Sequence, residues 1–499
     1  MVAQTTPVET LHSTMTEANT QLGVERMRHV IKLMVLLIAG ALPLAAQDGG
    51  KILLQGGRVI PVAGPEIENG KILIEFGKIT AVGKDVPTPF DATVIDCTGK
   101  VLMPGMVEAS TAKGLDLPNE TMDIGAFLTA ADALDPADRY FEEALRNGLT
   151  TVHVCQAENT VISGVSRVVR PIGLTVQEMT VRAEGGLRLM FGPKGGYDRS
   201  VQAAIMRDAF ADLDRYLDRL AEQLYEEDQK KQGKEVLVPP AEARKLGKEM
   251  ITLAKVDDVH RNLLRLRQGR LDAYLTCIKA MDVQRAIDLA KKEGFLARSS
   301  FVIGGECWKV VALLKETGRP IIIPASQLIA VERDRTTDED VETFVPKAFF
   351  DKKVGFAISN SAAPWYDAAR CVRNGVSREA ALAAITLNAA KAIGLEGRLG
   401  SLEAGKDGNV LVLSGDPLDA QTWVEASYIE GVRVYEREKD KRLRDLLKGV
   451  FETAEAEKKS APKTPATQSA PTSQPAAPAS GGSAAPATTQ PSSETPKKD

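Results

Sequence analysis

The chain has 499 residues, 43% hydrophobic and 26% charged, so it can bury a large core and is longer than one small domain. Its formal net charge of -4 gives no basic footprint of the kind that binds nucleic acid. The composition therefore excludes nucleic acid as the expected partner and favours a small molecule or another protein.

A targeting signal is predicted near the N-terminus. Residues 1–26 form a polar leader, and Met27 is an alternative start codon. Residues 27–46 have a basic start, a short apolar run and two final alanines, which is the pattern of a cleavable signal peptide. The run is too short for a stable membrane span, and an uncleaved anchor is the alternative. We expect an exported protein, periplasmic or extracellular, that meets the membrane only through this segment if it stays uncleaved.

Residues 47–103 predict a small all-β module, because short alternating strands are separated by glycine turns that suit hairpins. From residue 104 to 395, apolar strand-like runs alternate with amphipathic helical ones. The strand-like runs include LTTVHVC (149–155), LDAYLTC (271–277), FVIGG (301–305), PIIIPAS (320–326) and VGFAISN (354–360). This repeat predicts an α/β fold, a parallel (β/α)8 TIM barrel with its site at the C-terminal ends of the strands.

The rest of the chain divides by composition. Residues 396–437 return to a β pattern, and we expect them to pair with the N-terminal module, so that both ends of the chain build a small β-sandwich. Residues 438–459 predict a charged helix, and residues 460–499 a disordered tail of Ala, Pro, Ser and Thr. Within the barrel, the charge-rich stretch from Tyr225 to Lys248 predicts a solvated face.

The five cysteines form no CxxC pair and their number is odd, so no disulfide framework is indicated. An exported compartment leaves one disulfide pair open. Most of these cysteines are predicted to be small buried side chains.

Five segments follow one another in the order found in a known family. They are LMPGMVEASTAKG (102–114), ALDPADRYFEEALRNGLTTVHV (133–154), NTVISGVSRVV (159–169), AMDVQRAIDLAKKEG (280–294) and ITLNAAKAIGLEGRLGSLEAGKDGNVLVLSGDPLD (385–419). Together they resemble the imidazolonepropionase-related branch of the amidohydrolase superfamily. The resemblance implies a barrel with a composite β domain, and a hydrolase of carbon-nitrogen bonds other than peptide bonds that uses zinc or another divalent metal.

The same resemblance assigns the family's functional positions to residues that cannot perform the family's chemistry. Its first-strand histidine pair falls on Ser110 and Ala112, and its bridging acid falls near residues 191–194, where a short gap has removed it. The fifth-strand histidine falls on Thr276, or on Cys277 if the register slips by one residue. The remaining ligand position falls near Ile303, and the eighth-strand aspartate, the family's general base, falls on Asn360.

A hydroxyl and a methyl group cannot replace two imidazoles around a metal ion, and an amide cannot take up a proton near neutral pH. We therefore predict that the chain lacks the catalytic metal and has no other cofactor. The leading hypothesis is a homologue that binds a small ligand or a protein partner, either as a homo-oligomer or paired with an active homologue. The alternative is an active hydrolase with rebuilt, metal-independent chemistry.

Further pocket candidates follow from their places near strand ends. His153 points either into the barrel or toward the helices, and a packing role is favoured. Cys277 and Cys307 are candidate nucleophiles, although buried cysteine is the commoner case. Glu108 and Glu306 are carboxylates near strand ends, and Glu108 is expected to be structural. Lys194 lies in GPKGGYD (192–198), whose glycines allow close approach of an anion. His260 is expected on a surface face.

Overall fold

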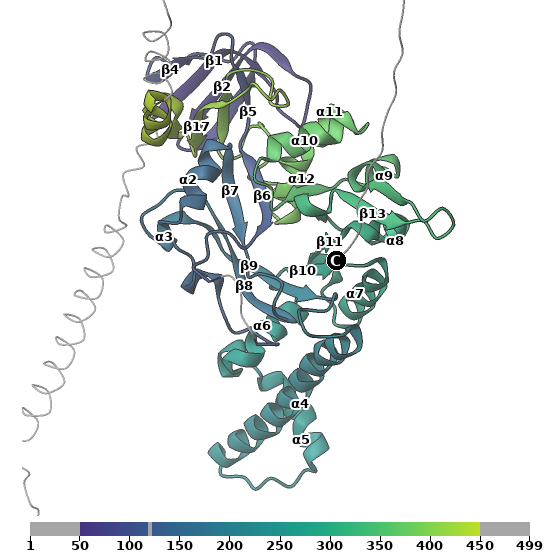
Figure 1. The fold of residues 1–499 in the computed structure, drawn as a ribbon. Coiled ribbons are helices and arrows are strands. Elements are labelled where there is room, and N and C mark those ends of the chain that lie inside the picture. The colour runs from purple at the N-terminus through teal and green to yellow at the C-terminus, as the bar shows by residue number, and fades with distance from the viewer. Residues whose placement is uncertain (1–49, 118–121, 450–499) are drawn as a thin grey trace, which may run out of the picture. The chain divides into compact units, whose positions relative to one another are not determined.

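The computed structural model describes residues 50–117 and 122–449 (Figure 1). The predicted leader, the signal peptide, residues 450–459 of the charged helix and the predicted tail lie outside these residues. The described part falls into a large unit ending at Lys441 and a second unit that begins at Arg442. In the second unit, residues 442–449 are helical. Within the described ranges, no helix is both long and apolar enough to cross a membrane.

Strands from both ends of the chain share one eight-stranded sheet. Its strands are β1 (Lys51–Val59), β2 (Ile67–Glu75), β3 (Lys78–Gly83), β4 (Ala92–Asp96), β5 (Val101–Pro104), β16 (Val410–Leu413), β17 (Val424–Ile429) and β18 (Val432–Glu436). The link between the two ends is the antiparallel pair of β16 with β5, in which Val410 faces Pro104. The predicted return of the C-terminal β segment to the N-terminal module is therefore confirmed.

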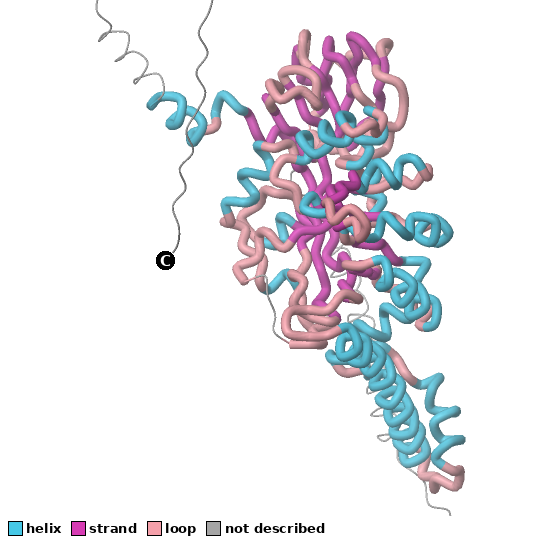
Figure 2. Tube along the Cα trace, turned by 45° about the vertical axis from the view of Figure 1, so that its right-hand side comes forward, coloured by secondary structure: helices cyan, strands magenta, loops and turns pink. Residues whose placement is uncertain are grey.

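The second eight-stranded sheet forms a nearly closed barrel, with strands at its centre and helices outside (Figure 2). Its strands are β6 (Met106–Thr111), β7 (Leu149–Val154), β8 (Ile162–Val169), β9 (Thr180–Met190), β10 (Ala273–Cys277), β11 (Ser299–Ile303), β12 (Ile321–Pro324) and β15 (Ala357–Ser359). Four of the five apolar runs named above contain one of these strands, and FVIGG (301–305) contains the last three residues of β11. They form strands because nearly all their residues are buried, which suits a parallel sheet covered on both faces.

The expectation of a strictly parallel (β/α)8 barrel is wrong at one strand. Strand β8 runs antiparallel to both β7 and β9, whereas the pairs from β9 to β15 are all parallel. The physical reason is the connection. A parallel neighbour needs a long crossover, usually a helix, but only residues 155–161 join β7 to β8. Such a short connection returns the chain antiparallel.

Helices follow most of the other strands. They are α2 (Arg139–Arg146), α3 (Val176–Met179), α4 (Arg199–Lys231), α5 (Pro240–Gly247), α6 (Asp258–Arg267), α7 (Ala280–Lys292), α8 (Val311–Thr317), α9 (Val345–Asp351), α10 (Pro364–Arg373), α11 (Arg378–Ala384) and α12 (Leu387–Ala392). A small hairpin, β13 (Ile329–Arg333) with β14 (Asp340–Phe344), follows β12. Helices α7 and α8 end before Gly294 and Gly318, whose positive φ angles of 82° and 62° suit a helix C-terminus.

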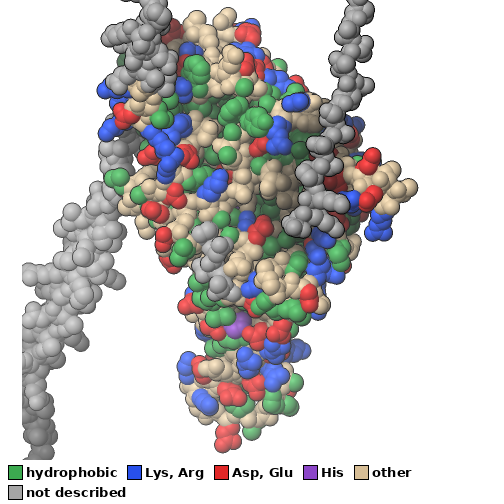
Figure 3. Space-filling model, in the orientation of Figure 1, with side chains coloured by type: hydrophobic (Ala, Val, Ile, Leu, Met, Phe, Trp, Pro, Cys, Tyr) green, Lys and Arg blue, Asp and Glu red, His purple; other side chains and the backbone are tan. Residues whose placement is uncertain are grey.

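The charge-rich stretch from Tyr225 to Lys248 begins in α4 and extends through α5 to the residue directly after it. Helices α4 and α5 project from the barrel strands (Figure 1). Most of its residues are exposed, so the predicted solvated face is confirmed. Figure 3 shows acidic and basic side chains mixed over this arm and over the rest of the visible face.

His260, expected on a surface face, is only 9% exposed. Its ring stacks on Tyr216 and contacts the carboxylates of Asp257 and Asp212 at 2.8 and 3.1 Å. The expectation was wrong because α6 packs this face of the helix against α4, a contact that the helical pattern does not reveal.

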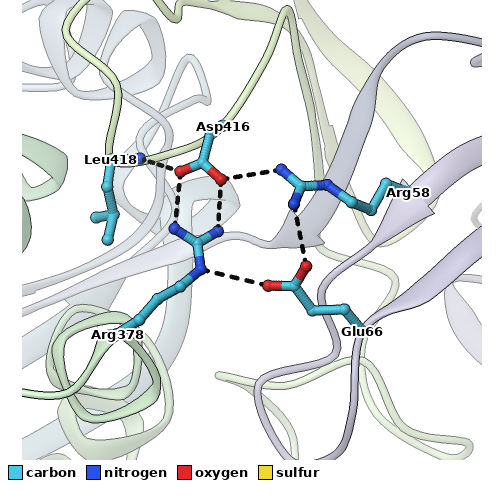
Figure 4. A network of polar contacts seen from close by, with 5 residues as sticks. All are labelled: Arg58, Glu66, Arg378, Asp416 and Leu418. Atoms are coloured by element: carbon cyan, nitrogen blue, oxygen red, sulfur yellow. Dashed lines mark hydrogen bonds and ion pairs between the residues drawn. The ribbon is translucent and has the colours of Figure 1, made fainter.

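The sheet built by strands from both ends of the chain, β1–β5 and β16–β18, is called the end-derived sheet below. A polar network joins it to the barrel's helices (Figure 4). Asp416, after β16, accepts two hydrogen bonds from Arg378 of α11 at 2.8 and 2.7 Å and one from Arg58 of β1 at 2.9 Å. Glu66 contacts both arginines as well. This alternating arrangement of two cations and two anions leaves no member of the network without an opposite charge.

Candidate functional site: a polar cavity at the barrel mouth

A cavity of 420 Å³ lies at the C-terminal ends of the barrel strands, where parallel barrels carry their sites. It is lined by Ser110, Thr111, Ala112, Ala157, Glu158, Arg188, Thr276, Ile278, Val302, Ile303, Gly304, Pro324, Ser326, Gln327, Ser359 and Asn360. Its volume lies within the range of small-molecule sites.

The five positions to which the resemblance assigns metal ligands or the general base all line this cavity. They come from four strands: Ser110 and Ala112 from β6 and its end, Thr276 from β10, Ile303 from β11 and Asn360 from the end of β15. In the alternative register, Cys277 would take the place of Thr276. Cys277 is fully buried in the hydrophobic core, so Thr276 is the residue that faces the cavity.

Ser110 is held by a buried polar cluster. Its backbone N–H donates to Glu108 Oε1 at 3.0 Å, and its Oγ lies 2.5 Å from Arg188 Nη2 and 3.4 Å from Cys155 Sγ. The serine hydroxyl therefore accepts from a cation.

Glu108 closes the barrel rather than lining its cavity. The same Oε1 atom accepts from the backbone N–H of Asn360 at 2.9 Å, so one carboxylate bridges the first and last strands. Burial raises the pKa of Glu108 to about 7, and the backbone hydrogen bonds only partly offset that effect. The expected structural role agrees with these contacts.

Asn360 adopts a left-handed conformation, with φ of 51°. Asparagine tolerates this region better than most residues, so the position suits an amide as well as an aspartate. Its Oδ1 accepts from Thr111 Oγ1 at 3.4 Å.

Arg188 is the functional candidate that the sequence reasoning missed. It lies in β9, is 6% exposed, and lines the cavity. A signal was present in the strand GGLRLMF: the period-2 alternation sets Arg188 on the face opposite to the core residues Leu187 and Leu189. A charged residue within a buried strand could have been flagged on that basis.

His153 does not reach the cavity. It is fully buried, its Nδ1 lies 2.7 Å from Ala109 O, and its Nε2 lies 2.7 Å from Ser166 Oγ. Burial lowers its pKa to about 3, so the ring stays neutral at physiological pH. These contacts are those of a packing histidine.

The other candidates also lie outside the cavity lining. Lys194 is buried and pairs with Asp123 at 2.6 Å. Cys277 and Cys307 are fully buried, and burial raises the pKa of Cys307 to about 12 and that of Cys277 well above its usual range. Glu306 is partly exposed in the short 3-10 helix Gly305–Val310 that follows β11. All five cysteines are free and buried.

The residues around the cavity do not fit a divalent metal ion. Within residues 50–117 and 122–449, no group of three or more His, Cys, Asp or Glu side chains is placed to hold one. At the first expected ligand position, Ser110 Oγ is already bonded to a guanidinium, whose positive charge opposes a second cation there.

The fold and the place of the cavity define an α/β barrel with a candidate site at its mouth. A sequence profile of the amidohydrolase family matches residues 360–435. In structure the chain is similar to an amidohydrolase from Thermotoga maritima, with 26% identity, a TM-score of 0.63, and coverage of 77% of this chain and 100% of that chain. Together these two findings support the amidohydrolase superfamily as the family of this chain.

A weaker similarity is to an adenosine deaminase from Xanthomonas campestris with bound zinc, at 16% identity and a TM-score of 0.45, covering 82% of this chain and 98% of that chain. No curated protein matches the sequence significantly.

Proposed function

We propose that this chain is a ligand-binding member of the amidohydrolase superfamily that does not carry out the superfamily's metal-dependent hydrolysis. The observation that carries the proposal is the convergence of Ser110, Ala112, Thr276, Ile303 and Asn360 on one cavity. The residues expected to hold a metal and its base are together in space, but their side chains are a hydroxyl, a methyl, a second hydroxyl, an alkyl group and an amide.

The chemistry of these side chains argues against hydrolysis. Divalent metals in such sites need imidazole, carboxylate or thiolate ligands, and a general base must accept a proton near neutral pH. The amide of Asn360 cannot do so. Ligand binding is favoured over a purely structural role because the barrel mouth contains an open cavity with both polar and apolar walls rather than packed apolar side chains.

No contact favours the alternative of rebuilt hydrolytic chemistry through His153, Cys277 or Cys307. Such a mechanism needs a thiol activated by a nearby base. The ring of His153 contacts Ala109 and Ser166, whereas Cys307 Sγ contacts the backbone oxygen of Cys277 at 3.3 Å. The high pKa of both thiols keeps them protonated and weakly nucleophilic.

Elemental analysis of the full chain, purified without chelators, tests the proposal. We expect far less than one zinc, iron or manganese ion per chain, and no rise in Tm when zinc is added, because an ion that binds only the native state would stabilise it. About one tightly held ion per chain would contradict the proposal.

Three further assignments belong to this proposal. The motif at residues 385–419 supports the imidazolonepropionase-related branch. The end-derived sheet carries buried apolar clusters that include Leu54 and Leu53, neighbours whose side chains point to opposite faces, as in a β-sandwich. The pattern in residues 27–46 supports export to the periplasm or the cell exterior, which N-terminal sequencing of the mature protein tests.

The protein partner also remains a proposal: a homo-oligomer, or a pair with an active homologue. Co-purification with a metal-bearing homologue would support the second form. A monomer without a partner would contradict both.

A further inference from the structure

The charge of Arg188 has no opposite charge among its hydrogen-bond partners. A guanidinium has five N–H donors. Here Nη1 donates to Gln156 O at 2.9 Å, and Nη2 donates to Ser110 Oγ at 2.5 Å and to Cys155 Sγ at 3.0 Å. These partners are a carbonyl, a hydroxyl and a thiol, and Nε is buried without a partner.

Two partly buried arginines of the barrel differ in this respect. Arg182 pairs with Asp272 at 2.5 Å, and Arg199 pairs with Asp282 at 2.9 Å. A buried cation without a counter-charge is costly, so an anion that enters the cavity and pairs with Arg188 would relieve that cost. Glu158, the carboxylate on the cavity wall, is exposed and is not among the hydrogen-bond partners of Arg188. The cavity therefore has a positive charge at a wall that water barely reaches.

Two hydroxyl groups on the cavity wall also lack partners. Thr276 is 3% exposed and Ser359 is 1% exposed, and neither Thr276 Oγ1 nor Ser359 Oγ has a hydrogen-bond partner within the described residues. Because each hydroxyl can donate a hydrogen bond, both can serve an anionic oxygen that enters the cavity.

The remaining walls restrict the kind of anion. Ile278, Val302, Ile303 and Pro324 give the cavity an apolar side, which suits a hydrocarbon group and not a fully hydrated inorganic ion. A carboxylate supplies the opposite charge that Arg188 lacks, and its hydrogen bonds to a guanidinium are charge-assisted and strong.

We propose that the cavity binds a small organic carboxylate. Its carboxylate pairs with Arg188 and accepts from the hydroxyls of Thr276 and Ser359, while its short hydrocarbon part packs against Ile278 and Ile303. This inference rests on the proposed function, in which the cavity is a ligand site, and it names the chemical class of the ligand.

Calorimetric titration of the full chain tests the proposal with matched probes: butyrate and benzoate, their neutral amides butyramide and benzamide, and inorganic phosphate. We expect the carboxylates to bind at least about tenfold more tightly than the amides, because only they supply the missing charge. No binding of either carboxylate at millimolar concentration would overturn the proposal, as would equal binding of the amides.

Variants identify the residue responsible. Arg188→Met should weaken the binding of benzoate by about tenfold or more. Arg188→Lys should weaken it less, because lysine keeps the positive charge but lacks the planar guanidinium donors. Arg167→Met is the matched control: Arg167 lies on the neighbouring strand β8, also bonds to a hydroxyl, that of Thr180, and does not line this cavity. It should bind benzoate as the wild type does.

If Arg188→Met fails to fold, Thr276→Val keeps the test open, since it removes one donor from the same site. Unchanged benzoate binding in Arg188→Met would overturn the proposal. If that variant does not fold, unchanged benzoate binding in both Arg188→Lys and Thr276→Val would overturn it. If phosphate binds more tightly than either carboxylate and this binding depends on Arg188, the proposal of a carboxylate ligand is wrong and the ligand is a phosphate. Equal binding of amides refutes this inference alone, whereas a tightly held metal ion refutes the proposed function.

Discussion

Two buried ionisable side chains meet at Ser110 with opposite roles. Glu108 accepts from its backbone N–H, and Arg188 donates to its hydroxyl. Because the pKa of Glu108 is raised to about 7, this carboxyl group is largely neutral under mildly acidic conditions. When Glu108 is neutral, it does not offset the positive charge of Arg188.

The pH dependence of stability tests the state of Glu108. Its pKa is raised from 4.5 to about 7 on folding, so its protonated form stabilises the fold below pH 4.5, and this contribution is lost as the pH rises through 7. The full contribution is about 3 kcal/mol. His153 acts in the opposite direction: its pKa falls from 6.5 to about 3, so its contribution grows as the pH rises through that interval.

We therefore expect the wild type to change little in stability between pH 4.5 and 6.5. In Glu108→Gln the compensation is absent, because the amide resembles the protonated carboxyl and does not titrate. The stability of the variant should therefore be close to that of the wild type near pH 5, rise with pH over this interval, and exceed that of the wild type at pH 8. Urea unfolding at pH 5, 6, 7 and 8 measures both proteins. Parallel profiles would show that Glu108 does not titrate in this range.

At the residue scale, the sequence was enough to locate the site but not to predict the positive charge of Arg188 in its wall. The flanking residues of Ser110 and Asn360 were enough to place both positions, and both line the cavity. The partners of Arg188 lie up to 78 residues away in the chain, at Ser110, and no local pattern states which partner a buried guanidinium finds. The same limit explains His260, whose burial depends on Tyr216 and Asp212 of another helix.

At the element scale, the network around Asp416 joins the end-derived sheet to α11 (Figure 4). Burial alone would raise the pKa of Asp416, but hydrogen bonds from Arg378, Arg58 and the Leu418 N–H lower it below the usual value. The stabilisation from this carboxylate is therefore present above the ordinary aspartate pKa and is lost as the pH falls through the lowered one.

Asp416→Asn should lower the free energy of unfolding by about 1–2 kcal/mol, a value reduced from that of buried pairs because the network is partly solvated. Asp338→Asn is the control, since Asp338 makes a similar two-bond contact with Arg333 in an exposed hairpin, at 2.6 and 2.7 Å. Asp338→Asn should change stability much less than Asp416→Asn does, because an exposed ion pair is screened by water. Equal losses in the two variants would show that partial burial adds nothing to the network.

The strands themselves follow from local pattern, whereas the direction of one strand does not. Runs such as LTTVHVC and FVIGG are buried along their length, which hydrophobicity alone predicts. The antiparallel direction of β8 depends on its pairing with β7 and β9, and similar apolar composition would serve either direction.

At the scale of the whole molecule, the two ends of the chain complete each other's sheet. Strand β16 pairs with β5 over four residue pairs, and Leu102 and Met103 of β5 are fully buried. Loss of β16 would leave an unpaired edge and expose apolar surface.

Two truncations test this dependence. A chain ending at Asn409 lacks β16, β17 and β18 and should lose cooperative thermal unfolding. A chain ending at Lys441 keeps the entire sheet and the contact of Arg146 with Asp440, and its Tm should stay within about 2 °C of the full chain. Circular dichroism on heating distinguishes them, and cooperative unfolding of the shorter chain would contradict the proposed dependence.

The sequence by itself determined the apolar strands, the order of the family's motifs and the loss of histidines from the expected ligand positions. These properties are local, since they depend on side-chain type and spacing. Only the tertiary structure decided that the altered positions share one cavity, that β8 reverses and that Arg188 faces neutral partners. Those properties depend on which distant segments pack together, and a buried charge takes its chemical meaning from the groups around it.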